Sequence, residues 1–162
     1  MSDAIDPPAL APARELGLEP RVVATDRPSS AEESAALQGI ALGNLLRTIV
    51  VRRGEDDYVF ILVPGGRQID WPALRAHLGV SRISLPEKEE AREATGYERG
   101  TITPFGATRA WPVIAAPAIA ELDPVAIGAG AHGVNLHLPG RALLDALGAD
   151  LADVTRPAEA RD

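Results

Sequence analysis

Two stretches rich in valine and isoleucine, separated by four turn-forming residues, constrain the fold more than any other feature of the chain. Arg47–Arg53 and Tyr58–Val63 have the composition of strands, and Gly54-Glu55-Asp56-Asp57 lies between them. β-branched and aromatic residues favour strands, and a short linker of glycine and acidic residues suits an antiparallel connection. The sequence therefore predicts a β-hairpin at its centre.

Helices and further strands are predicted on both sides of this hairpin. Ser29 and Ser30 each precede a glutamate by three residues, which is the capping-box spacing, and Gly39 ends the helix that follows. The other expected helices are Ala9–Leu18, a helix capped by Asp70 that runs to Leu78 before Gly79, Pro86–Thr95 and Gly140–Leu147. The other expected strands are Arg21–Thr25, Ser81–Leu85, Trp111–Ala115, Pro124–Ile127 and Val134–Leu138. Strands and helices do not alternate regularly, so we expect an α+β domain with a mixed sheet.

The length of 162 residues fits one domain. We expect an N-terminal segment with a short helix (1–20), a folded domain (21–155) and a polar tail (156–162). The absence of cysteine excludes disulfides, thiolate metal sites and cysteine nucleophiles. Apolar runs such as Tyr58–Val63 are far shorter than the ~20 residues of a membrane span, and Met1-Ser2-Asp3-Ala4 is unlike a signal peptide. We therefore expect a cytoplasmic protein.

The chain is acidic, with 16 basic and 23 acidic residues and a net charge of −7. Proteins that grip nucleic acid along its backbone usually carry a basic face. Arg52 and Arg53 are followed at once by Glu55, Asp56 and Asp57, and no basic cluster stands out along the sequence. Any contact with nucleic acid is therefore expected to be local.

The segment Gly128-Ala129-Gly130-Ala131-His132-Gly133 matches the G-x-G-x-x-G pattern of dinucleotide-binding turns. That interpretation requires a helix directly afterwards, whereas Val134–Leu138 alternates like a strand and only 29 residues follow Gly133. We favour a glycine turn between two strands, whose bare backbone can approach a ligand.

The histidines and the acidic helix offer no familiar catalytic pattern. No acid or nucleophile stands at a recognisable spacing from His77, His132 or His137, so neither a metal site nor a catalytic triad is predicted. His77 and His137 are interpreted as surface or packing residues, while the glycine turn leaves His132 as a candidate contact. Four glutamates at positions 87, 89, 90 and 93 are interpreted as the solvated face of a helix.

The loop from Gly96 to Gly106 contains three glycines and a proline within eleven residues. Long loops of this kind often carry function. Read with its neighbours, the loop resembles the YbaK-type aminoacyl-tRNA deacylases, a family that includes the editing domain of prolyl-tRNA synthetase. The resemblance covers about Arg21 to Val154. It rests on four elements in order, which are Arg47-Thr48-Ile49-Val50-Val51 (similar to the family's "KTLVV" strand), Thr95-Gly96-Tyr97, Gly100-x-x-x-Pro104-Phe105-Gly106, and the glycine turn Gly128–Gly133.

The resemblance implies a strongly curved mixed sheet and hydrolysis of the ester that joins a wrong amino acid to the 3′ end of tRNA. In the family, backbone amides, a water and the substrate's own ribose hydroxyl carry the reaction, so no cofactor or metal is implied. The implied partner is the acceptor end of mischarged tRNA, with neither membrane nor DNA. Because the chain is acidic, we expect a synthetase or elongation factor to deliver the tRNA, or a high Michaelis constant for free tRNA.

The family resemblance also assigns the candidate site. Arg47, in the place of a lysine that positions the terminal adenosine, and Gly100 are the catalytic candidates. The substrate-binding candidates are Thr101, Ile102, Pro104, Phe105, Gly128, Ala129, Gly130 and His132. Two positions depart from the family pattern: arginine replaces the lysine, and Gly128-Ala129-Gly130 stands where Ser-Gly-Gly is common. The alternative is a non-catalytic module that binds a tRNA 3′ end or a small ligand.

Overall fold

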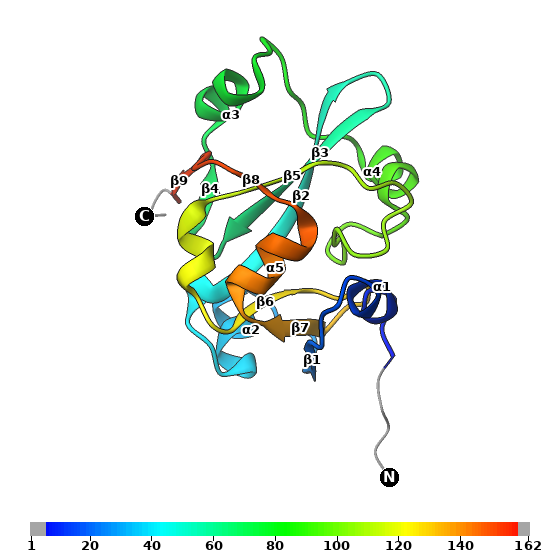
Figure 1. Cartoon of the computed structure of the whole chain (residues 1–162), viewed down its shortest axis with the longest axis vertical. Coiled ribbons are helices and arrows are strands. Elements are labelled where there is room, and N and C mark those ends of the chain that lie inside the picture. Colours follow the sequence, from blue (N-terminus) through cyan, green and yellow to red (C-terminus); the bar gives the residue numbers. More distant parts are fainter. Residues whose placement is uncertain (1–5, 159–162) are drawn as a thin grey trace.

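A seven-stranded mixed sheet organises the computed structural model, which describes residues 6–158 (Figure 1). Its strands lie in the order β1-β7-β6-β2-β3-β5-β8. Their bounds are β1 (Arg21–Ala24), β2 (Leu45–Gly54), β3 (Asp57–Pro64), β5 (Val113–Ala115), β6 (Val125–Gly128), β7 (Val134–Leu138) and β8 (Asp150–Leu151). The pairs β1–β7, β6–β7 and β2–β3 are antiparallel, whereas β2–β6, β3–β5 and β5–β8 are parallel. The predicted α+β fold with a mixed sheet is confirmed.

The predicted hairpin is the centre of this sheet. β2 and β3 pair from Leu46 opposite Pro64 to Gly54 opposite Asp57, and Asp56 in the turn has a φ of 52°. Along β3 the side chains alternate between two buried clusters, with Tyr58, Phe60 and Leu62 in one and Val59, Ile61 and Val63 in the other. A strand covered on both faces needs an uninterrupted apolar sequence, which explains its composition.

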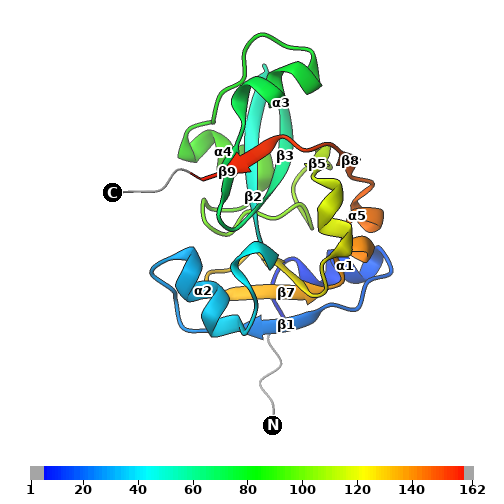
Figure 2. The same ribbon diagram turned by 90° about the vertical axis from the view of Figure 1, so that its left-hand side faces the viewer.

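Helices cover both faces of the sheet. α1 (Leu10–Glu15), α4 (Lys88–Thr95) and α5 (Gly140–Leu147) contribute to the first cluster, and α3 (Trp71–Leu78) contributes Leu74 to the second. α2 (Ala31–Gln38) packs Ala35 against Leu45 and Ala126 in a third, smaller cluster. Figure 2 shows β1 and β7 running across the direction of β2 and β3, so the sheet is strongly curved.

The helix caps follow the sequence closely. Ser30 is the N-cap of α2 and its hydroxyl accepts a hydrogen bond from the amide of Glu33 at 3.0 Å, while the Glu33 carboxylate accepts from the amide of Ser29 at 2.9 Å. Asp70 accepts from the amide of Ala73 in the same way. Because both caps are local, sequence spacing alone locates them.

The structure differs from the sequence expectations at several places, which include the unexpected short strand β8. Ser81–Leu85 is not a strand, because only Ser84 bridges to Arg52. β4 (Arg67–Ile69) pairs with β9 (Thr155–Pro157) in a separate two-stranded sheet, so residues 156 and 157 of the expected polar tail lie in a strand. The short 3-10 helices η1 (Leu42–Asn44) and η2 (Pro117–Glu121) were not expected.

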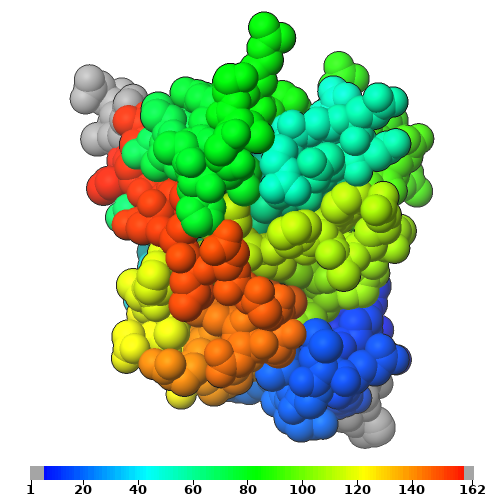
Figure 3. Space-filling model, turned by 45° about the horizontal axis from the view of Figure 1, so that its top comes forward, coloured from blue at the N-terminus to red at the C-terminus, as the bar shows by residue number. Residues whose placement is uncertain are grey.

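The C-terminal segment, red in Figure 3, lies over the surface between the green segment and the orange α5. The remaining positions of the expected terminal segments, 1–5 and 159–162, lie outside the described residues.

Candidate functional site

A pocket of about 680 Å³ opens where β2 and β6 separate. The two strands pair only at Leu45–Ala126 and Leu46–Ile127, after which β2 continues along β3 and β6 turns back into β7. Beyond Leu46, β2 has β3 on one side only, and its other, unpaired edge forms one wall of the pocket. The pocket is lined by Arg27–Ala31, Ser34, Leu45–Val50, Leu85, Pro86, Ala91, Arg99, Gly100, Ile102, Gly128 and Ala131–Asn135.

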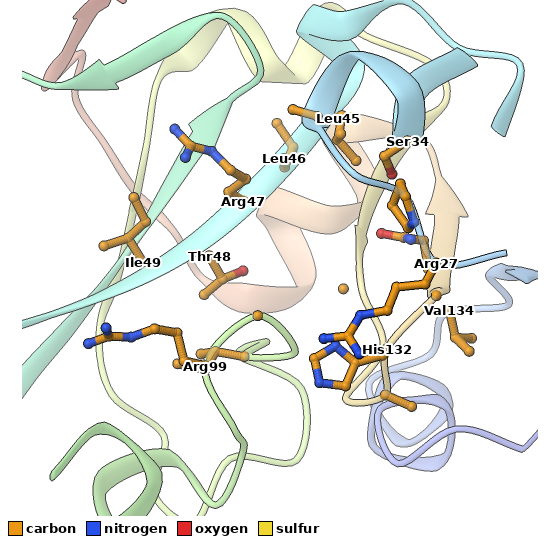
Figure 4. A pocket seen from close by; sticks show the side chains of 18 of the residues that line it. Arg27, Ser34, Leu45, Leu46, Arg47, Thr48, Ile49, Arg99, His132 and Val134 are labelled. Carbon is orange, nitrogen blue, oxygen red and sulfur yellow. The ribbon is translucent and has the colours of Figure 1, made fainter. Parts of the chain in front are cut away.

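Neighbouring residues of β2 present different groups to this pocket. The guanidinium of Arg47 donates to the carbonyl oxygen of Arg67 at 3.0 Å, and Figure 4 shows it directed away from His132. Thr48 points to the other side of the strand, towards the loop that carries Arg99 (Figure 4). Its hydroxyl oxygen is buried and has no hydrogen-bond partner within residues 6–158. Buried polar atoms usually have a partner, so this oxygen is available to a ligand.

The glycine loop and the glycine turn meet at Gly100 and His132. Gly100 has a φ of +94°, and a Cβ at this position would lie 3.4 Å from Cε1 of His132. The imidazole therefore lies against the bare backbone of Gly100, and its Nε2 is 3.6 Å from a carboxylate oxygen of Glu98. The Gly100 amide donates to no acceptor within the described part of the chain, so it is free to donate to a ligand.

The pocket is positively charged although the chain is acidic. Arg27, Arg47 and Arg99 line it, and no aspartate or glutamate is among its described lining residues. Arg99 donates to the carbonyl of Pro86 at 3.1 Å, and Arg27 makes no hydrogen bond or ion pair within residues 6–158. Figure 4 shows Arg27 extending in the direction of His132. Folding thus gathers arginines that are far apart in the sequence.

Five of the residues predicted for the site line the pocket. They are Arg47, Gly100, Ile102, Gly128 and His132. Gly128 follows the last residue of β6 that pairs with β2, and a Cβ there would lie 3.4 Å from the carbonyl oxygen of Ile102. The glycine loop and the glycine turn, which are separate in the sequence, therefore form adjoining walls.

The other five predicted residues, Thr101, Pro104, Phe105, Ala129 and Gly130, are not among the lining residues. The Thr101 hydroxyl donates back to the carbonyl of Glu98 at 2.8 Å, and Phe105 and Ala129 are buried in the first core cluster. Gly130 serves packing, because a Cβ there would lie 2.6 Å from Cε1 of Tyr97 and 3.0 Å from Pro8.

Sequence reasoning also missed several lining residues. Thr48 adjoins Arg47, and Ser34 follows the capping serine Ser30 by one helical turn, but neither spacing indicates a pocket. Arg27 reaches the pocket only because β1 pairs with β7, which places the segment before α2 beside the glycine turn. This proximity is tertiary, and no local signal in the sequence encodes it.

The remaining histidines have structural partners, as interpreted from the sequence. Nε2 of His77 lies 2.7 Å from a carboxylate oxygen of Asp150, and Nε2 of His137 lies 2.8 Å from the side-chain oxygen of Gln38. Burial, and secondarily the charge of Arg21, lower the pKa of His137. No group of three metal-ligating side chains occurs within residues 6–158.

The topology settles one alternative that the sequence raised. The glycine turn leads from β6 directly into the antiparallel strand β7, so a dinucleotide-binding turn, which opens a helix, is excluded. None of the helices in the described part of the chain is both long and apolar enough to cross a membrane.

The fold and the site together define a class: a curved mixed-sheet domain with a cationic pocket beside a glycine loop. A family model described as "Aminoacyl-tRNA editing domain" matches residues 26–146, and the chain therefore belongs to this family. A "Putative Cys-tRNA(Pro)/Cys-tRNA(Cys) deacylase EbsC" of Enterococcus faecalis is 25% identical over 126 residues, which cover 78% of this chain and 77% of that protein.

A larger relative matches the same domain, and a solved structure shares the fold. The proline–tRNA ligase of Heliobacterium modesticaldum is 31% identical over 121 residues, which cover 74% of this chain and 21% of the ligase. The chain thus spans about a fifth of that enzyme. A crystal structure described as "a putative trans-editing enzyme for prolyl tRNA synthetase" has the same fold, with a TM-score of 0.83 at 23% identity over 94% of this chain and 99% of that chain.

Proposed function

We propose that this domain is an aminoacyl-tRNA deacylase that removes the amino acid from mischarged tRNA. The observation that carries the proposal is the cationic pocket with no carboxylate among its described lining residues, in a chain whose net charge is −7. Such a pocket suits the phosphates of a tRNA end, and it confines the attraction to the part of the surface that must hold the reacting ester.

The reaction needs an attacking water and donors for the developing oxyanion. The water oxygen attacks the ester carbonyl carbon, the bond to the ribose oxygen breaks, and a proton passes to that ribose oxygen. The products are the free amino acid and tRNA with its terminal diol restored. The free amide of Gly100 and the hydroxyl of Thr48 are suitable oxyanion donors, and one such donor contributes ~10²–10³ in rate.

The remaining residues have roles in binding. Arg27 and Arg99 attract the phosphates of the terminal nucleotides, and Ile102 and Gly128 bound the space for the aminoacyl group. His132 forms the rim against Gly100. Arg47 anchors a phosphate by releasing the carbonyl of Arg67, because a guanidinium can exchange one acceptor for a charged one.

A second candidate function is a binding module without catalysis. It is favoured by Arg47, whose guanidinium donates to the backbone of Arg67 and is directed away from His132. Both proposals predict affinity for a tRNA 3′ end, and only the first predicts turnover.

A deacylation panel separates them. The purified protein, with Arg47→Ala and Arg47→Lys as variants, is offered tRNAs that carry alanine, serine, cysteine, threonine or proline. Release of one amino acid that is lost in Arg47→Ala supports the enzyme. Release by Arg47→Lys alone means that arginine has stopped catalysis in an intact fold. Binding without release by all three supports the module, and the absence of both binding and release contradicts both proposals.

The acidic surface predicts weak binding of free tRNA. Outside the pocket the charge opposes nucleic acid, so we expect a dissociation constant above ~10⁻⁷ M at physiological salt unless a synthetase or elongation factor delivers the tRNA. Tighter binding without a partner contradicts this expectation.

A further inference from the structure

A line of three buried side chains runs from the sheet to the wall of the pocket. Nε2 of His137, on β7, lies 2.8 Å from Oε1 of Gln38, and Nε2 of Gln38 donates to Oγ of Ser34 at 2.9 Å. Their exposed fractions are only 7%, 9% and 9% for His137, Gln38 and Ser34. Ser34 is the member that lines the pocket, and Figure 4 shows its hydroxyl directed down from α2.

The chemistry of the three groups determines which atom donates and which accepts in each of the two hydrogen bonds. The side-chain oxygen of Gln38 only accepts, so His137 donates from Nε2. Burial and the nearby charge of Arg21 lower the pKa of His137, so its ring is neutral and carries that one N–H. The amide nitrogen of Gln38 only donates, so the oxygen of Ser34 receives a hydrogen bond and its own proton is left over.

That proton has no acceptor within residues 6–158. Buried polar networks are costly unless each member is satisfied. Beside this network, Ala35, Leu45 and Ala126 pack as apolar residues, so an apolar side chain at position 38 would suit the seam between α2 and the sheet. The retained polar chain ends at the pocket with an oriented donor.

We propose that Ser34 donates a hydrogen bond to an oxygen of the esterified terminal nucleotide, and that Gln38 and His137 are positioning residues that fix the direction of this bond. The inference rests on the proposed function and adds to it a third donor. This donor lies on a different wall of the pocket from Thr48 of β2 and from the loop that carries Gly100. A substrate without an oxygen at this point would leave the donor unpaired and would be discriminated against.

The test uses variants that exchange a hydrogen-bond donor for an acceptor while keeping the size of the side chain. Gln38→Glu replaces the donating nitrogen by an oxygen, so the Ser34 hydroxyl must donate to the carboxylate and offers only lone pairs to the pocket. We expect Ser34→Ala and Gln38→Glu each to lower kcat/KM for deacylation about tenfold, the usual size of one hydrogen bond. Ser34→Thr keeps the hydroxyl and should retain most of the activity. Ala36→Ser, on the exposed side of the same helix, is the control and should equal wild type.

Non-additivity separates positioning from simple support of the fold. If Gln38 acts through Ser34, adding Gln38→Glu to Ser34→Ala should cost no further activity, because the donor is already absent. Purely structural roles would give losses that add together and that follow the thermal unfolding temperature. Full activity of Ser34→Ala, or additive losses in the double variant, would overturn the inference while the proposed function stands.

A different result identifies failure of the proposed function itself. If wild type releases no amino acid, the same variants are titrated with an aminoacyl-adenosine analogue whose ester is replaced by an amide. Affinity about tenfold lower in Ser34→Ala and in Gln38→Glu then supports the inference without catalysis. Equal affinity of wild type and both variants, or no binding by wild type, overturns it.

Discussion

The arginines at the tip of the hairpin lie beside carboxylates, whereas Arg47 and Arg99 of the pocket do not. At the tip, Arg53 donates twice to the carboxylate of Asp57, at 2.9 and 3.0 Å, and Arg52 lies 3.4 Å from the carboxylate of Glu90. In the pocket, Arg47 and Arg99 donate to backbone carbonyls. The charge is therefore neutralised at the tip and remains available in the pocket, so of these two regions the pocket is the one suited to meet an anion.

The tip also shows what paired charges do to the groups around them. The hydrogen bond from Arg53 lowers the pKa of Asp57 and raises the pKa of Arg53 itself. Burial, followed by the hydrogen bond to Glu90, raises the pKa of Tyr58 to about 12. The contacts of Arg52 and Tyr58 with Glu90 join the hairpin to α4. The exposed ion pairs contribute little, ~0–1 kcal/mol each. The electrostatics of the tip are thus satisfied internally.

The largest effect is expected when the two sets of arginines are neutralised in two separate variants. We expect Arg27→Gln, Arg47→Gln and Arg99→Gln together to lower kcat/KM at least about 100-fold, because each loses a hydrogen bond to a charged group. The control carries Arg52→Gln, Arg53→Gln and Arg109→Gln. Arg109 lies over the ring of Trp111, and none of the three residues lines the pocket, so the control removes the same charge outside it. Steady-state deacylation at one fixed salt concentration checks both variants. Equal losses would show that net charge, and not the pocket, controls activity.

The second test compares two glycines with positive φ, one in the pocket and one outside it. Gly100, at +94°, adjoins His132, whereas Gly79, at +68°, follows the last residue of α3 and has open space where a Cβ would lie. Alanine at either position strains the backbone by ~1–3 kcal/mol. We expect both variants to unfold at lower temperature, but only Gly100→Ala to lose activity as well, by about 10–100-fold if its amide serves as an oxyanion donor. An active Gly100→Ala enzyme would remove the loop from the site.

The sequence predicts the local features of this molecule and misses the long-range ones. The hairpin, both capped helices and the glycine turn depend on neighbouring residues, and all are confirmed. Strand β4 is three residues long, carries Arg67 and Gln68, and exists only because β9 pairs with it from the far end of the chain. Conversely, Ser81–Leu85 has the composition of a strand but finds a single partner at Ser84.

The same division applies to the site. Gly100 and Gly128 are predictable because bare backbone at a turn is visible in the sequence. Gly128 lies just beyond the last residue of β6 that pairs with β2, and it lines the pocket. The methyl group of the next residue, Ala129, packs in the core. The arginine cluster is not predictable, because Arg27 and Arg99 come to line the same pocket only in the folded chain.

A third prediction compares one arginine of the pocket with one arginine of the hairpin tip. Arg27 has no protein partner within residues 6–158, so Arg27→Gln should leave the thermal unfolding temperature unchanged and weaken binding of the tRNA end. If Arg27 contacts a phosphate, the slope of log affinity against log salt should fall by about one. Arg53→Gln is the matched control, with a slightly lower unfolding temperature and the wild-type salt slope. An unchanged slope in Arg27→Gln would mean that Arg27 does not meet a phosphate.

The smallest expected effect concerns the neutral histidine behind the pocket. Burial and Arg21 lower the pKa of His137 below its ordinary value of 6.5, so in the window between the two values the unfolded chain binds the proton more readily. The free energy of unfolding should therefore decrease as the pH falls from 6.5 towards the folded-state pKa, by at most about 1.4 kcal/mol for each unit of difference. His137→Gln keeps a nitrogen donor for Gln38 but does not titrate, so urea unfolding at pH 7 and pH 5 should show a smaller loss for this variant than for wild type. An equal loss in both would mean that His137 takes up its proton in the folded protein, and that the neutral ring is not what holds Gln38 and Ser34 in their direction.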